Sequence, residues 1–194
     1  MRAAIIRKET PHVTDTQERR ERDWLASHAG QVLAEVGIGP GQVVLDFGCG
    51  KGTYALAAAR LVGDAGAVHA LDKDGDALAE LSRKAAEERL ENIRVGHTSG
   101  ELDLPVPNAS CDAMLLYDVL QLIDDWPKLL TEALRVLKPG GVLSVFPMHV
   151  DNDKVRQRAE QAGFAAPTQL HGLLNFTEPA TQQRPHVRSS EASQ

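Results

Sequence analysis

Asp46 and the three glycines at alternate positions after it are the residues of this chain best suited to binding a charged small molecule. Gly48, Gly50 and Gly52 lack a Cβ, so they permit positive φ and let a ligand lie against bare backbone. The amides that open the following helix carry partial positive charge and are expected to be unpaired, which suits an anionic group. The carboxylate of Asp46 suits an ammonium. A ligand with an amino-acid moiety satisfies both features.

The spacing of the glycines limits the choice of ligand. The pattern is G-x-G-x-G, with Thr53 where the dinucleotide fingerprint would have its last glycine. A Walker loop is excluded, because Lys51 precedes Gly52 and no Gly-Lys-Ser/Thr follows. Asp46 would also repel a pyrophosphate. S-adenosylmethionine combines an amino-acid moiety with a ribose and an adenine, and an ordinary glycine-rich strand–helix turn is the alternative.

A second carboxylate, Asp72, follows the next apolar run and lies about twenty residues past the glycine turn. An acid at the end of a second strand can accept hydrogen bonds from both ribose hydroxyls of an adenosine. The other interpretation is a helix-capping or solvated acid, and Asp74 and Asp76 are rivals for the ribose role.

The elements that must position these residues alternate between strand and helix. Strands are predicted from Val43 onward and over 67–71, 93–96, 113–116 and 142–146, and helices over 14–37, 76–90, 127–137 and 153–162, with a strand or hairpin within 167–176. Such alternation predicts an α/β fold with a doubly wound, mostly parallel sheet and helices on both faces. Ligands of these sheets bind beyond the carboxyl ends of the strands, where 46–52, Asp72, 99–101 and Tyr117 fall.

The composition is that of an ordinary globular protein. The chain has 194 residues, 42% of them hydrophobic, and a net charge of −6, which argues against a nucleic-acid partner. Cys49 and Cys111 are the two cysteines, so a disulfide framework is not implied and a cytoplasmic location is expected. The N-terminal apolar segment is too short for a signal peptide, and no apolar run reaches membrane-spanning length.

Three regions are expected along the chain. Residues 1–40 form a helical segment that covers the cofactor and substrate cleft, 41–178 form the cofactor-binding domain, and 179–194 form a polar, flexible tail.

Residues 41–146 resemble the class I S-adenosylmethionine-dependent methyltransferases. The resemblance is carried by VVLDFGCGKGTYAL, VHALDKD, LPVPNASCDAMLLYDVL and LRVLKPGGVLSV. Within that superfamily the chain most resembles the small methyltransferases related to ubiquinone and menaquinone biosynthesis. The resemblance implies a Rossmann-like methyltransferase fold with a seven-stranded sheet and S-adenosylmethionine as cofactor.

The resemblance also implies roles for particular residues. The acid and glycines matching Asp46, Gly48 and Gly50 surround the methionine moiety in the family, the acid matching Asp72 holds the ribose, and the segment 99–101 lies beside the adenine. The complete candidate cofactor set is Asp46, Gly48, Cys49, Gly50, Gly52, Asp72, Lys73, Ser99, Gly100, Glu101 and Tyr117. Relatives often carry Asp-Ala where Gly100-Glu101 stands, and two histidines where Gln121-Leu122 stands.

The predicted function is methyl transfer to an unidentified, small-molecule acceptor. A methyltransferase-like partner subunit without activity and a nicotinamide oxidoreductase are the alternatives, and the G-x-G-x-G spacing with Asp46 disfavours the latter. No general base is assigned, although Tyr117 and Asp118 are near the right place. His149 and His171 could reach the substrate side, or could be ordinary exposed histidines. A thiolate site for arsenic, as in arsenite methyltransferases, is disfavoured with two cysteines, and no metal site is assigned.

Overall fold

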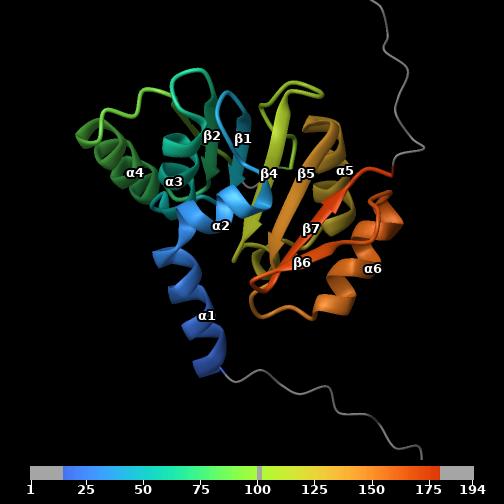
Figure 1. Ribbon diagram of the computed structural model, residues 1–194. Helices are drawn as coiled ribbons and strands as arrows, with labels where there is room; N and C mark the ends of the chain where they lie inside the picture. The colour runs from blue at the N-terminus through green and yellow to red at the C-terminus, as the bar shows by residue number, and fades with distance from the viewer. Residues whose placement is uncertain (1–14, 100–101, 180–194) are drawn as a thin grey trace, which may run out of the picture.

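The structure is a computed structural model that describes residues 15–99 and 102–179. Its central feature is a seven-stranded sheet with the strand order β3-β2-β1-β4-β5-β7-β6 (Figure 1). The first five strands in this order run parallel, whereas β7 is antiparallel to β5 and β6 is antiparallel to β7. This confirms the predicted α/β, mostly parallel, doubly wound sheet.

The strands follow the apolar runs of the sequence, because a strand covered on both faces buries every side chain. Their bounds are β1 Val43–Phe47, β2 Ala67–Asp72, β3 Ile93–His97, β4 Cys111–Tyr117, β5 Leu137–Phe146, β6 Thr168–Leu170 and β7 Leu173–Thr177. Four of the five residues of β1 are buried, and so are six of the seven of β4.

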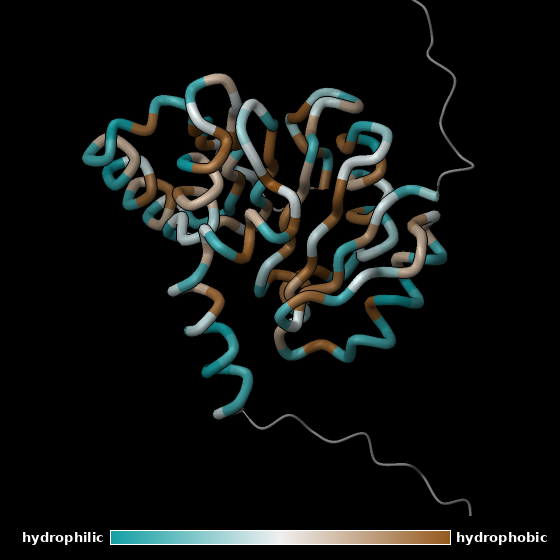
Figure 2. Tube along the Cα trace, viewed as in Figure 1, coloured by the Kyte–Doolittle hydropathy of each residue, from teal (hydrophilic) through white to brown (hydrophobic). Residues whose placement is uncertain are grey.

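Helices cover the two faces of the sheet. Their bounds are α1 Asp15–Ser27, α2 Ala29–Val36, α3 Thr53–Val62, α4 Gly75–Glu87, α5 Trp126–Val136 and α6 Asn152–Ala162, with a short 3-10 helix η1 at Leu120–Leu122. The side chains of α1 to α4 form one hydrophobic core with one face of the sheet, and those of α5 and α6 form a second core with the other. Figure 2 shows the hydrophobic residues concentrated along the central strands and hydrophilic residues over much of α1 and α6.

Aspartates fix where three of these helices begin. Asp74 accepts hydrogen bonds from the amides of Asp76 and Ala77, while Asp125 and Asp151 each accept one from the residue three positions ahead. Such N-caps satisfy donors that a helix leaves unpaired, so the local sequence sets these helix starts.

Some local predictions need correction. The helix predicted over 14–37 is two helices, α1 and α2, and the break lies at His28, the N-cap of α2. Residues 138–141, between the predicted helix 127–137 and the predicted strand 142–146, belong to β5, which pairs with β4 through an irregular register between Cys111 and Ala113. The segment predicted as a strand or hairpin is the β6–β7 hairpin. Residues 1–14 and 180–194, including nearly all of the predicted tail, lie outside the described residues.

Strand order reverses between β1 and β4. β2 and β3 continue from one side of β1, and β4 and β5 from the other. Open α/β sheets bind ligands at this point, beyond the carboxyl ends of the strands.

Candidate functional site

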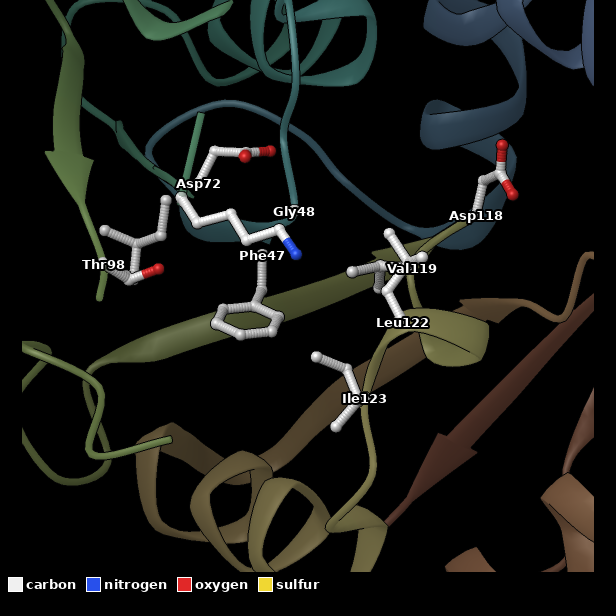
Figure 3. Close-up of a pocket in the computed structure, with 10 residues that line it drawn as sticks. Phe47, Gly48, Asp72, Thr98, Asp118, Val119, Leu122 and Ile123 are labelled. Atoms are coloured by element: carbon white, nitrogen blue, oxygen red, sulfur yellow. The ribbon is translucent and has the colours of Figure 1, made fainter. Parts of the chain in front are cut away.

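A pocket of about 520 Å³, including its open mouth, lies at the carboxyl ends of β1, β2 and β4. Its lining residues are Phe47, Gly48, Leu71, Asp72, Lys73, Thr98, Asp118, Val119, Leu122 and Ile123. Figure 3 shows Asp72 and Thr98 at one end, Asp118 at the other, and Phe47, Val119 and Ile123 between them. Apolar walls with a few polar groups at the ends are typical of a small-molecule site of this size.

Asp46 lies beneath the glycine turn and is 2% exposed. Its Oδ2 atom is buried without a hydrogen-bond partner among the described residues. Burial, followed by the nearby charge of Asp72, raises the pKa of Asp46 to about 7, although a hydrogen bond from the Ala55 amide acts in the opposite direction. A buried carboxylate oxygen without a partner is costly, and a cationic ligand group would supply what it lacks.

The glycine turn is fastened to the end of β2. The amides of Gly48 and Cys49 donate to the Leu71 carbonyl at 2.8 and 3.1 Å, and the amide of Gly50 donates to Oδ2 of Asp72 at 2.7 Å. The prediction of unpaired amides at the start of the following helix is wrong for Ala55, whose amide donates to Asp46. The turn is held in shape by the protein itself.

The three glycines of the turn have different reasons to be glycine. All three have positive φ. A Cβ on Gly48 would lie 2.5 Å from Cγ2 of Val119, and one on Gly52 would overlap Leu81 of α4, so both allow close packing. A Cβ on Gly50 would meet nothing within 4 Å, so this glycine borders open space. Gly50 is the glycine beside which a ligand has room.

Asp72 belongs to the pocket and its rivals do not. Its Oδ1 accepts from the Asp74 amide at 2.9 Å, and Oδ2 accepts from Gly50. Asp74 instead caps α4 with its own side chain, and Asp76 is an exposed residue of the first turn of α4. Of the three acids, Asp72 alone is among the pocket-lining residues.

The predicted adenine-side segment, 99–101, begins directly after a residue that lines the pocket. Thr98, directly after β3, lines the pocket, and its amide donates to the Asp72 carbonyl at 2.9 Å. Ser99 is exposed and is not among the lining residues. Gly100 and Glu101 lie outside the described residues, and Lys73 lines the pocket.

Tyr117 faces the core rather than the pocket. Its hydroxyl lies 2.8 Å from Oγ of Ser144, which donates to Oδ1 of Asn175 at 2.6 Å. Because Ser144 has one hydroxyl proton, Tyr117 must be the donor of the first bond. The ring of Tyr117 contacts Tyr54 edge-on, with centroids 4.7 Å apart. Tyr117 thus ties β4 to β5 and β7.

Cys49 is buried in the turn, and its Sγ lies 3.7 Å from the Gly50 carbonyl oxygen. Burial and the charges of Asp46 and Asp72 raise the pKa of Cys49, so the thiol stays protonated. A role in packing beside the ligand space is compatible with this state. Within residues 15–99 and 102–179, groups of three or more acidic, histidine or cysteine side chains able to hold a metal ion are absent. None of the helices described is long and apolar enough to cross a bilayer.

The apolar lining of the pocket is absent from the residues predicted from the sequence, and consists of Phe47, Leu71, Val119, Leu122 and Ile123. The signal that could have found them is position, because each lies at a strand end of the switch point or in the segment directly after β4. From the sequence alone, apolar residues at strand ends are predicted to belong to the hydrophobic core. The sequence does not show that a pocket lies over them.

The mostly parallel seven-stranded sheet, with its antiparallel β7 and a pocket at the switch point, defines a Rossmann-like fold of the class I methyltransferase type. Residues 44–141, half of the chain, match the model of the methyltransferase domain family. The chain belongs to this family, the S-adenosylmethionine-dependent methyltransferases, and S-adenosylmethionine is its cofactor. The match decides against the nicotinamide oxidoreductase alternative.

Individual relatives support the predicted subgroup. The chain is 30% identical over 138 residues to a 2-phytyl-1,4-naphtoquinone methyltransferase of Trichormus variabilis, covering 68% of this chain and 60% of that protein. It is 31% identical over 109 residues to a demethylmenaquinone methyltransferase of Halalkalibacterium halodurans, covering 56% and 44%. The chain thus spans about half of the length of these curated relatives.

Solved structures share the fold. An S-adenosylmethionine-dependent methyltransferase from Aquifex aeolicus has a TM-score of 0.69 at 21% identity, covering 82% of this chain and 97% of that one. The phosphoethanolamine N-methyltransferase 2 of Haemonchus contortus, in complex with S-adenosyl-L-methionine, has a TM-score of 0.63 at 22% identity, covering 79% and 42%.

Proposed function

We propose that this chain transfers the methyl group of S-adenosylmethionine to a small aromatic acceptor of the quinol or phenol type. The observation that carries the proposal is the pocket at the switch point, with Asp72 at one end and Asp118 at the other. The aromatic class of the acceptor is supported by the relatives named as a 2-phytyl-1,4-naphtoquinone methyltransferase and a demethylmenaquinone methyltransferase.

The residues present fit the cofactor. Asp72 would hold the ribose hydroxyls, and the apolar walls formed by Phe47, Leu71 and Ile123 would enclose the adenine. The unpartnered Oδ2 of Asp46 would take the ammonium of the methionine moiety, with Gly50 leaving the room that the moiety needs. When bound, the cofactor supplies an electrophilic methyl group on a sulfonium, which is the difficult part of the chemistry.

The protein's own contribution is to orient the reactants and exclude water. The bonds from Gly48, Cys49 and Gly50 to the end of β2 fix the turn before any ligand arrives. Such preorganisation lowers the entropic barrier to bringing donor and acceptor into line.

The N-terminal helices cover the acceptor side in this proposal. Glu18 of α1 pairs with His149, directly beyond the β5 end, at 2.7 Å, and Glu35 of α2 pairs with His171 of the β6–β7 turn at 2.7 Å. These pairs give His149 and His171 a role in holding the helices. A cytoplasmic location is part of the proposal and is supported by two buried, free cysteines.

Two measurements test the function. Calorimetric titration with S-adenosylhomocysteine should show binding, and binding to the native state at a hundredfold excess over Kd should raise stability by about 2.7 kcal/mol. Release of S-adenosylhomocysteine should then be followed with chemically reduced 2-alkyl-1,4-naphthoquinones. Binding without turnover on phenolic acceptors would favour the partner-subunit alternative, and absence of binding would refute the proposal.

A further inference from the structure

We infer that Asp118 is the catalytic residue that accepts the hydroxyl proton of an aromatic acceptor, and that Gln121 is its positioning residue. The inference rests on the proposed function and specifies it: the acceptor carries an ionisable hydroxyl on an aromatic ring. Four observations lead to it, namely the place of Asp118, its backbone, its partner and its charged neighbours.

Asp118 follows the last residue of β4, at the edge of the sheet where the switch point lies. It lines the pocket at the end opposite Asp72. Figure 3 shows its carboxylate directed away from Leu122 and Ile123, toward the N-terminal helices. If Asp72 holds the ribose, Asp118 lies at the end left for the acceptor.

The backbone of Asp118 is in the left-handed region, with φ of 55°. A side chain other than glycine costs free energy there, and such residues persist where the surroundings hold them. Its amide donates to the Phe146 carbonyl at 3.2 Å, which fixes the residue between the ends of β4 and β5. With this conformation, the chain leaves the extended geometry of β4 at Asp118.

Gln121 donates hydrogen bonds to both the backbone carbonyl and the carboxylate of Asp118. Its Nε2 donates to the Asp118 carbonyl oxygen at 2.9 Å and to Oδ1 of the carboxylate at 2.7 Å. An ionised carboxylate can accept several further hydrogen bonds, so one from a substrate hydroxyl is compatible with this arrangement. Gln121 therefore fixes the rotamer of Asp118 and leaves the carboxylate able to accept further hydrogen bonds.

Tyr54 of α3 connects Asp118 to the N-terminal side. Burial raises the pKa of Tyr54 first, the charges of Asp46 and Asp118 raise it further, and Arg22 of α1 lowers it, so the phenol ring lies near all three charged groups. Of the two carboxylates, Asp46 is buried beneath the glycine turn, whereas Asp118 lines the pocket. The Asp118 carboxylate disfavours an acidic acceptor, and a neutral aromatic hydroxyl combines a ring for Tyr54 with a proton for Asp118.

The proton and electron balance closes without another reactant. The acceptor's O–H proton passes to the Asp118 carboxylate, and the electron pair that this releases forms the new bond to the methyl carbon, at the oxygen or through the ring at an adjacent carbon. The pair of the broken S–C bond stays on sulfur, which becomes a neutral thioether. At carbon, loss of the ring proton to water restores aromaticity, and Asp118 returns its proton to solvent.

The first experiment measures binding of 1-naphthol and of naphthalene to protein saturated with S-adenosylhomocysteine. For Asp118→Asn, we expect 1-naphthol to bind about tenfold more weakly, because a charge-assisted hydrogen bond is lost. Naphthalene, which lacks the hydroxyl, should bind within about twofold of wild type. Asp124→Asn is the matched control, since Asp124 is exposed, lies in the same segment and is not among the pocket-lining residues.

The second experiment measures the pH dependence of kcat/KM with reduced 2-methyl-1,4-naphthoquinone. Asp118→Asn should lower kcat/KM by about 10²-fold or more and remove the acidic limb of the profile, while the Kd of S-adenosylhomocysteine stays within about twofold. Gln121→Leu should lower kcat/KM less and shift the acidic limb, because the carboxylate remains but is no longer held. Asp124→Asn should keep the wild-type profile.

Failure of the inference and failure of the proposed function give different results. If wild type binds S-adenosylhomocysteine but does not bind 1-naphthol, or binds it equally in Asp118→Asn, the inference is wrong and cofactor binding stands. The inference is also wrong if Asp118→Asn keeps the wild-type turnover and an unchanged pH profile. If wild type does not bind S-adenosylhomocysteine, the proposed function is wrong and the inference falls with it.

Discussion

Nε2 of His171 lies 2.7 Å from Oε2 of Glu35, although the two residues are 136 positions apart in the chain. The first belongs to the turn between β6 and β7, and the second to α2. The ring of Trp24 in α1 packs against the same histidine, with centroids 4.9 Å apart. The turn of the β6–β7 hairpin therefore contacts both N-terminal helices.

Replacing Glu35 with glutamine should weaken this attachment in a pH-dependent way. A hydrogen bond from Gln31 and then the one from His171 lower the pKa of Glu35 below its ordinary value of 4.5. A lowered carboxylate pKa stabilises the fold above the unfolded pKa, and this contribution is lost as pH falls through the folded pKa. Thermal denaturation at pH 7 should show a melting temperature lower by on the order of one or two degrees, and the difference should be smaller at pH 3, because the pH has then fallen below the ordinary value of 4.5 toward the lowered pKa.

The control for Glu35→Gln is Glu21→Gln. Glu21 is an exposed acid whose side-chain hydrogen bond, within the part of the chain that the structure describes, comes from Gln17 of its own helix at 3.1 Å. Its replacement should leave the melting temperature almost unchanged at both pH values. Equal effects of the two substitutions would show that the contact with His171 does not stabilise the protein.

Asp46 should make the protein free of ligand less stable at neutral pH than in mild acid. Its pKa in the folded state is raised to about 7 from 3.8, so between these values the folded protein holds a proton that the unfolded chain has released. Stability therefore falls as pH rises through this window, by at most about 4 kcal/mol. Asp46→Asn should flatten the curve and unfold at a higher temperature than wild type at pH 8, while binding S-adenosylhomocysteine more weakly. Parallel stability curves for the two proteins between pH 4 and 8 would contradict this account.

Much of the fold could be predicted from the sequence because its signals are local. The run from Val43 to Phe47 is buried because it is apolar, and Asp74 begins a helix because its side chain reaches the amides two and three residues ahead. The glycine pattern and the acid at the end of β2 likewise predicted the edge of the sheet at which the pocket lies.

The site could be predicted less well because its details depend on contacts between distant residues. The sequence does not show that Asp72 accepts a hydrogen bond from the Gly50 amide, 22 residues away, or that the Tyr117 hydroxyl bonds to Ser144. It also does not show that the chain leaves β3 so that Thr98, rather than Ser99, lines the pocket. Each of these outcomes is decided by packing between strands.

Gly48 and Gly50 should respond differently to replacement by alanine. At Gly48, with φ of 79°, the added Cβ would overlap Val119, so Gly48→Ala should destabilise the protein by about 2–5 kcal/mol. At Gly50, with φ of 49° and open space around the Cβ, the cost should be about 1–2 kcal/mol. Denaturant unfolding measures both. Gly50→Ala should still weaken S-adenosylhomocysteine binding, and unchanged affinity would show that the cofactor does not approach this glycine.

Asp72 and Asp74 allow cofactor recognition to be separated from helix capping. Asp72→Ala should reduce the affinity for S-adenosylhomocysteine by about tenfold to a few hundredfold, because charge-assisted hydrogen bonds to the ribose are lost. It should also destabilise the free protein by about 1–3 kcal/mol, because the Gly50 and Asp74 amides both lose their acceptor. Asp74→Ala removes an N-cap of α4 and should cost about 1 kcal/mol of stability with little change in affinity. Calorimetric titration and denaturant unfolding of both variants measure these effects. A loss of binding in Asp74→Ala but not in Asp72→Ala would show that the assignment of the ribose to Asp72 is wrong.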